Sequence, residues 1–191
     1  MISIIDYKVG NIFNVRNALK YLGFDSKVIN TKREIKNAKA IILPGVGAFD
    51  DAIKQLKKDE IFYCLKNKIS DGIPTLGICL GMQLLAKQSE EGIEEGLGIF
   101  DTEVKKFKSK KGIIPHMGWN KVDFLNNTSK YFYFVHSFYL PIVKNTIGVT
   151  NYITEFSSVI EVNNIIATQF HTEKSGVDGL KILKKFGDLS C

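Results

Sequence analysis

Cysteine is scarce in this chain of 191 residues, which contains only Cys64, Cys79 and Cys191. Three widely spaced cysteines cannot build a disulfide framework, and no CxxC pair or HExxH helix provides the ligand spacing of a zinc site. We therefore expect no structural disulfide, no metal ion and no other cofactor.

Long apolar runs are also missing. No stretch approaches the roughly 20 apolar residues that span a bilayer. Residues 1–6, Met-Ile-Ser-Ile-Ile-Asp, lack the basic region and the cleavage site of a signal peptide and are typical of a strand. We expect a soluble, cytoplasmic protein without a membrane partner.

The net charge of +6 is not concentrated in a basic patch, because the lysines are spread along the chain. The one dense run covers residues 105–111, and such a run is typical of a solvated loop. We expect no nucleic-acid partner.

Hydrophobic residues make up 45% of the chain, which is enough for one sizeable core. Residues 1–191 are therefore expected to form a single domain. In the first half, four short strand-like runs alternate with amphipathic segments, which is the pattern of a parallel sheet flanked by helices. These runs cover residues 2–5, 26–29, 40–43 and 74–78.

The second half has a different texture. After residue 98, strand candidates follow one another closely at residues 131–135, 147–150, 158–162 and 165–168, with a plausible hairpin turn at 163–164. The apolar spacing of residues 176–186 predicts a closing helix. The predicted fold class is α/β, with a three-layer, mostly parallel sheet, flanking helices and an added antiparallel strand region.

A cysteine stands on the corner between a strand and a helix. The segment Gly-Ile-Cys-Leu-Gly at residues 77–81 has the glycines that a strained strand-to-helix turn needs, so it resembles a nucleophile elbow built around Cys79. The following helix would direct its positive end at the sulfur and favour the thiolate. The alternative is a small buried hydrophobe at a glycine-rich turn.

A thiolate nucleophile needs a base, and His171 is the best placed of the three histidines. Glu173 follows two positions later, and in an extended strand both side chains would share one face, so that the carboxylate orients the imidazole. The alternative is a solvated strand end. His136 lies within an aromatic strand and reads as a hydrogen-bonded core residue, whereas His116 follows a proline in an expected loop.

Acyl transfer also needs hydrogen-bond donors for an oxyanion. The peptide N–H of Leu80 is one candidate, and the glycine-rich loop at residues 43–49 is a second source. That loop lacks the Lys-Ser/Thr pair of a phosphate-binding loop, and its glycines do not complete a dinucleotide pattern. An ordinary connection between strand and helix is the remaining alternative.

Taken together, these motifs resemble the class I glutamine amidotransferase family, whose members hydrolyse the side-chain amide of glutamine and pass the ammonia to a synthase. More narrowly, the chain is similar to the free-standing glutaminase subunits of histidine biosynthesis. The matching stretches span nearly the whole length, at residues 5–11, 43–49, 115–120, 133–139 and 169–175. The resemblance implies Cys79 as nucleophile, His171 as base and acid, and Glu173 as its orienting partner.

The same resemblance implies a glutamine-binding set formed by Gln83, Glu91 and the backbone around Ser137 and Phe138. An α-ammonium needs acceptors and an α-carboxylate needs donors, so these residue types suit the ligand. For Glu91, a solvated place in an acidic run is the alternative.

The resemblance also assigns an oxyanion N–H to the peptide at Val46 and Gly47, held misoriented until a partner docks.

The partner that the resemblance implies is a (β/α)₈-barrel cyclase subunit that uses ammonia on a phosphorylated ribulosyl intermediate. Trp119, Asn120, Tyr133 and Lys174 fall at positions that the family uses at or near the docking face. An exposed tryptophan would suit an interface anchor, while a lone tryptophan in the core is the alternative.

One departure from the family is Thr172, where proline usually separates the triad histidine from the glutamate. Threonine is a good strand residue, so the directions of His171 and Glu173 should survive, with looser alignment and lower activity as a hypothesis.

Three other functions compete with a glutaminase of histidine biosynthesis. The same chemistry could supply ammonia to a synthase that amidates sugars of surface glycans. A non-catalytic docking protein and a cysteine peptidase of similar fold are the others, and the intact triad and Gln83 argue against them respectively.

Overall fold

The computed structural model describes residues 1–8, 11–108 and 112–190. Cys191, part of the basic run at 105–111 and part of the motif at 5–11 lie outside the described residues.

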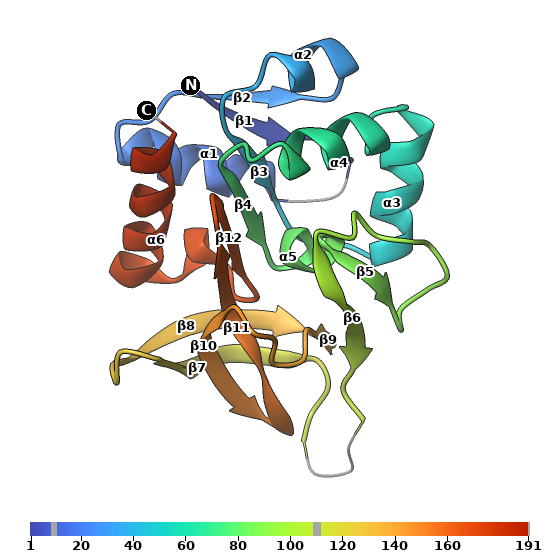
Figure 1. The fold of residues 1–191 in the computed structure, drawn as a ribbon. Coiled ribbons are helices and arrows are strands. Elements are labelled where there is room, and N and C mark those ends of the chain that lie inside the picture. Colours follow the sequence, from blue (N-terminus) through green and yellow to red (C-terminus); the bar gives the residue numbers. More distant parts are fainter. Residues whose placement is uncertain (9–10, 109–111, 191) are drawn as a thin grey trace.

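A nine-stranded sheet forms the frame of the molecule, in the order β2-β1-β3-β4-β12-β11-β10-β7-β8 (Figure 1). The first five strands in that order are parallel, namely β2 (Ser26–Ile29), β1 (Ile2–Ile5), β3 (Ile41–Leu43), β4 (Thr75–Ile78) and β12 (Ile165–Thr168). The antiparallel strands β11 (Thr154–Val162), β10 (Thr146–Tyr152), β7 (His116–Phe124) and β8 (Ser129–His136) continue the same sheet. The predicted α/β class with an added antiparallel region is confirmed.

A smaller sheet lies beside the large one. It consists of β5 (Ala86–Ser89), β6 (Phe100–Lys106) and β9 (Phe138–Tyr139), with β5 parallel and β9 antiparallel to β6.

Helices cover both faces of the parallel strands, so the predicted three layers are present (Figure 1). One face packs on α1 (Ile12–Tyr21) and α6 (Gly176–Leu189) through Val15, Leu19, Leu183 and Phe186. The other face packs on α2 (Lys32–Lys36), α3 (Phe49–Lys58), α4 (Phe62–Ser70) and α5 (Leu80–Leu84). Burial of these apolar stripes away from water is the main force that holds the layers together.

Helix α1 illustrates how the sequence sets an element. The side chain of Asn11 accepts a hydrogen bond from the backbone N–H of Asn14, which caps the start of the helix. Val15 and Leu19 are four residues apart and are the two fully buried positions, so one stripe faces the sheet.

The carboxyl ends of β3, β4 and β12 meet at one edge of the sheet. The three strands are adjacent and parallel, with Leu43 opposite Gly77 and Ile78 opposite Thr168. The segments that follow them hold the loop at 44–47, Cys79 and His171. Ligand sites of α/β sheets form at such strand ends.

No helix in the described ranges is long and apolar enough to cross a membrane.

Candidate active site

Cys79 sits on a strained corner directly after β4. Its φ of 52° and ψ of −106° are unusual for a residue with a side chain, and this conformation turns the chain from the strand into α5. A Cβ on Gly81 would lie 1.9 Å from the carbonyl oxygen of Leu43, and one on Gly77 would lie 2.8 Å from the carbonyl oxygen of Gly81. Glycine is therefore required for this packing, as the sequence predicts.

The helix after Cys79 is shorter than its apolar sequence suggests. Helix α5 spans only Leu80–Leu84, and the chain then enters β5. Five residues align few peptide dipoles, so the helix contributes little to the electrostatics at the sulfur.

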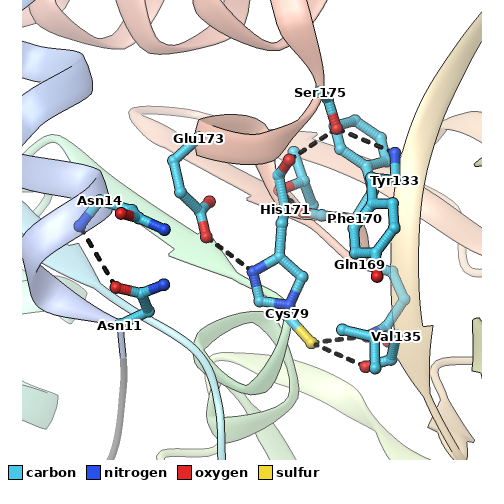
Figure 2. A network of polar contacts seen from close by, with 11 residues as sticks. Asn11, Asn14, Cys79, Tyr133, Val135, Gln169, Phe170, His171, Glu173 and Ser175 are labelled. Carbon is cyan, nitrogen blue, oxygen red and sulfur yellow. Dashed lines mark hydrogen bonds and ion pairs between the residues drawn. The ribbon is translucent and has the colours of Figure 1, made fainter. Parts of the chain in front are cut away.

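His171 and Glu173 form a buried pair. Nδ1 of His171 lies 2.8 Å from Oε1 of Glu173, and each side chain is about 1% exposed. In Figure 2 the imidazole lies between the glutamate carboxylate and Cys79, with the ring nitrogen Nε2 on the side of the sulfur. Nε2 is buried and has no hydrogen-bond partner in the described chain, so it is placed to exchange a proton with the reacting atoms.

The backbone that joins this pair differs from the predicted extended strand. Strand β12 ends at Thr168, and residues Thr172–Lys174 form a short 3₁₀ helix, η1. The expected same-face geometry of alternate strand residues is therefore wrong. The turn brings the carboxylate back to the imidazole instead.

Hydrogen bonds to the edge strand β8 hold His171 in place. Its backbone N–H donates to the carbonyl oxygen of Tyr133 at 3.0 Å, and its carbonyl oxygen accepts from the hydroxyl of Ser175 at 2.6 Å. The Ser175 hydroxyl oxygen also accepts from the N–H of Tyr133 at 2.9 Å (Figure 2). These hydrogen bonds hold β8 and the turn at residues 171–175 in place against each other.

The electrostatics of the site favour a charged imidazole. Burial lowers the pKa of His171, but the charge interactions and hydrogen bonds with Cys79 and Glu173 outweigh burial and raise the pKa to about 10. A protonated His171 in turn stabilises negative charge on the sulfur.

The sulfur opens into a pocket of about 290 Å³. Every residue predicted for the oxyanion and for glutamine binding lines this pocket, namely Val46, Gly47, Leu80, Gln83, Glu91, Ser137 and Phe138. The pocket is large enough for an amino-acid ligand of the size of glutamine.

The loop after β3 is pressed against the elbow. A Cβ on Gly45 would lie 1.9 Å from the carbonyl oxygen of Ile78 and 2.5 Å from the backbone nitrogen of Leu80. Gly47 has a φ of 114°, which only glycine adopts without strain. Peptide groups of this loop therefore lie close to the N–H of Leu80.

Glu91 is half-buried beside the pocket rather than solvated in the acidic run. Its Oε2 accepts a hydrogen bond of 2.7 Å from the backbone N–H of Phe49, at the start of α3. Burial raises the pKa of Glu91; the bond from Phe49 opposes this shift, and the charges of Asp50 and Asp51 add to it.

Three of the residues predicted for docking form one surface patch next to His171. Trp119 is 57% exposed and meets the ring of Tyr133 edge to face at 6.3 Å. The Nζ atom of Lys174 lies 5.9 Å from the centroid of the same ring. We call Trp119, Tyr133 and Lys174 the aromatic patch. The alternative of a core tryptophan is wrong.

The other two histidines are both buried. His136 is 6% exposed and hydrogen-bonded at the end of β8, as predicted. His116 is 3% exposed and begins β7, so its predicted place in a loop is wrong. Pairing with His136 across the two strands draws it into the sheet.

Gln169 is a site residue that sequence reasoning missed. Its Nε2 lies 3.6 Å from the Cys79 sulfur, and its Oε1 accepts from Nε2 of Gln83 at 3.1 Å. The carbonyl oxygen of Val135 lies 3.9 Å from the same sulfur (Figure 2). The only available signal was a polar residue between β12 and His171.

No group of three or more metal-binding side chains occurs among residues 1–8, 11–108 and 112–190.

Comparison with known proteins identifies a family and close relatives of this chain. The family model of glutamine amidotransferase class-I matches residues 3–188. The imidazole glycerol phosphate synthase subunit hisH of Cyanophora paradoxa is 46% identical over 203 residues, covering 100% of this chain and 94% of that protein. Subunit HisH of Caldanaerobacter subterraneus subsp. tengcongensis is 47% identical over 200 residues, covering 99% and 98%.

Solved structures with low sequence identity share the fold. A crystal structure of a glutamine amidotransferase matches with a TM-score of 0.79 at 18% identity and covers 99% of this chain and 98% of the other. A chain in the structure of PurLQS from Thermotoga maritima matches with a TM-score of 0.77 at 17% identity and covers 98% and 97%.

Proposed function

The chain belongs to the class I glutamine amidotransferase family, and from this premise we propose that it is the glutaminase subunit of an imidazole glycerol phosphate synthase. The observation that carries the proposal is the buried pair of His171 and Glu173 beside Cys79, which lines a pocket of glutamine size, in a chain that matches HisH subunits over its whole length. Residues 1–191 act as a single amidotransferase domain, because one sheet runs through both halves.

In the first half of the reaction, the thiolate of Cys79 attacks the side-chain amide carbon of glutamine. The N–H of Leu80 and a peptide N–H at Val46 and Gly47 stabilise the oxyanion. Nε2 of His171 then protonates the departing nitrogen, so that ammonia leaves and a thioester to Cys79 remains.

In the second half, water cleaves the thioester. Nε2 of His171 takes a proton from the water, the hydroxide attacks the carbonyl carbon, and the thiolate of Cys79 leaves. The balance is glutamine plus water giving glutamate plus ammonia. Glu173 keeps the imidazole oriented and stabilises its positive charge throughout.

Gln83 presents an acceptor to the substrate. Its Nε2 donates to the carbonyl oxygen of Phe138 at 2.9 Å and to Gln169 at 3.1 Å, which uses both N–H groups. The remaining polar atom, Oε1, is the acceptor for the α-ammonium of glutamine. Glu91 adds negative charge for that ammonium, and the backbone at Ser137 and Phe138 binds the substrate further.

The ammonia goes to a (β/α)₈-barrel cyclase subunit, which makes imidazole glycerol phosphate for histidine biosynthesis. The aromatic patch and Asn120 are the proposed docking residues, since an exposed tryptophan packed on a tyrosine is typical of interface anchors. A sugar-amidating synthase as the recipient is not favoured, because the relatives described above are imidazole glycerol phosphate synthase subunits.

The experiment is glutamate release from glutamine by the purified protein, alone and with a candidate cyclase and its ribulosyl ligand. We expect strong activation by the liganded cyclase. Cys79→Ala should lower the rate by roughly 10³-fold or more. Cys64→Ala is the matched control, because Cys64 lies on α4 and should leave the rate unchanged.

Three results would contradict the proposal in different ways. Activity that survives in Cys79→Ala excludes Cys79 as nucleophile. Glutaminase activity without activation by the cyclase points to another recipient. The absence of glutamate release under all conditions indicates a docking protein.

A further inference from the structure

A chain of buried and partly buried hydrogen bonds leads from the docking strand to the nucleophile. It begins at Asn120, whose Nδ2 lies 3.1 Å from Nε2 of His116. Nδ1 of His116 lies 3.0 Å from Nε2 of His136. Nδ1 of His136 lies 2.7 Å from the carbonyl oxygen of Phe138.

The proton positions along this chain have one solution. The carbonyl of Phe138 can only accept, so Nδ1 of His136 carries the proton and Nε2 is an acceptor. Nδ1 of His116 must then donate to His136, which leaves Nε2 of His116 as an acceptor for Nδ2 of Asn120. Oδ1 of Asn120 accepts from the N–H of Lys121 at 2.7 Å, which agrees with this orientation.

Both histidines are neutral, as this arrangement requires. Burial lowers the pKa of His116 to about 4. Burial lowers the pKa of His136 to about 3; the bond to Phe138 opposes this shift, and electrostatic interactions with His116 and His171 add to it. The His116 ring is also clamped by stacking on Tyr152 at 4.0 Å.

The chain continues from the same carbonyl to the sulfur. Phe138 accepts from Nε2 of Gln83, Gln83 donates to Gln169, and Nε2 of Gln169 donates to Sγ of Cys79. The two histidines are therefore hydrogen-bonded, through His136, to the same Phe138 carbonyl that holds Gln83.

The start of the chain lies beside the aromatic patch. Asn120 is partly exposed and follows Trp119 in β7, where Trp119 pairs with Tyr133. A partner that contacts Trp119 would move the same strand segment. The three polar side chains Asn120, His116 and His136 form what we call the imidazole relay.

We propose that the imidazole relay transmits docking of the partner at β7 to the Phe138 carbonyl and Gln83, and so couples docking to glutamine binding next to Cys79. Its members are positioning residues, because they act through Phe138 and Gln83. This inference rests on the proposed function for its partner and its substrate. The proton arrangement can be tested without either.

The first test is imidazole nitrogen NMR on protein labelled at histidine. We expect both His116 and His136 as neutral tautomers protonated on Nδ1 at pH 7. In Asn120→Asp the carboxylate can only accept, so the His116 resonances should change to a proton on Nε2 or to an imidazolium. Protonation of either histidine on Nε2 in the unaltered protein would overturn the relay.

The second test is the ratio of glutaminase rates with and without saturating cyclase, with saturation checked by titration. Asn120→Asp replaces the donor at the start of the relay by an acceptor, so the hydrogen bond to His116 must change direction. His116→Phe interrupts it in the interior and keeps a ring for the stack on Tyr152. We expect either change to lower the ratio about tenfold, mainly through the KM for glutamine. Asn151→Asp is the charge-matched control at an exposed position of β10 and should keep the ratio.

The outcomes separate the relay from its alternatives. A lower ratio in both variants supports the relay, while a lower ratio in Asn120→Asp alone shows a local docking effect and overturns it. Unchanged ratios also overturn it. If His116→Phe does not fold, the tautomer measurement decides. Failure of the proposed function would appear differently, as no glutaminase activity in the unaltered protein.

Discussion

Replacing Thr172 with proline should stabilise this protein. Thr172 is the first residue of η1, and its buried hydroxyl has no hydrogen-bond partner among the described residues. Proline favours the first position of a helical turn, and its fixed φ matches that of a 3₁₀ helix. The preceding residue, His171, already has the extended conformation that proline requires, with φ −83° and ψ 104°.

The magnitude follows from two contributions. A buried hydroxyl without a partner costs about 1–3 kcal/mol, and removing it recovers part of that cost. Proline restricts the unfolded chain and adds about 0.4–1 kcal/mol. We expect a total gain of about 2 kcal/mol in the free energy of unfolding, which is roughly 4–8 °C in Tm for a domain of this size.

The assay is urea unfolding of the unaltered protein, Thr172→Val and Thr172→Pro. The valine variant replaces the hydroxyl by a methyl group of similar size and should give about half of the gain. The difference between the two variants isolates the proline ring. A valine variant less stable than the unaltered protein would show that the hydroxyl has a partner and would refute the reasoning. Glutaminase turnover of Thr172→Pro tests the separate hypothesis of loose alignment, which predicts a rise.

Three further predictions concern the elbow, the buried histidines and the docking patch. Gly81→Ala should lower the free energy of unfolding by about 3 kcal/mol in urea titrations, because its Cβ would meet the carbonyl oxygen of Leu43 at 1.9 Å; unchanged stability would contradict the close packing. The pKa values of His116 and His136 are lowered to about 4 and 3, so only the unfolded state binds protons as pH falls below about 6.5. Each histidine should remove about 1.5 kcal/mol of stability between pH 6.5 and 5, and NMR titration of either ring with a midpoint near 6.5 would oppose this. Trp119→Ala should weaken binding of the cyclase by about 2 kcal/mol, roughly 30-fold in Kd by calorimetry, and an unchanged Kd would remove Trp119 from the interface.

The parts of this fold that depend on local pattern could be predicted from the sequence. The β-branched runs are the observed parallel strands, because a buried strand needs a short continuous apolar stretch. The corner at Cys79 could be predicted from the glycines on either side of it. Glycine is needed there because a Cβ at either position would clash with neighbouring backbone atoms.

The parts that depend on contacts distant in the sequence could not be predicted. The turn at Thr172 depends on Ser175, whose hydroxyl bonds to Tyr133 on another strand. The place of His116 in a strand depends on its pairing with His136, twenty residues later. The sequence predicts the pair of His171 and Glu173 correctly, but it does so from an extended strand. The structure has a 3₁₀ helix at this place.

The hydrogen bonds that hold His171 have a second consequence for the behaviour of the whole chain. Strand β8 is the last strand of the nine-stranded sheet, and an open strand edge is a template for aggregation. At Tyr133 the N–H is taken by Ser175 and the carbonyl by His171, so the turn that carries the histidine also blocks the middle of that edge. Loosening this turn would uncover a pairing site for a second molecule, so selection against self-association and selection for the histidine act on the same few atoms.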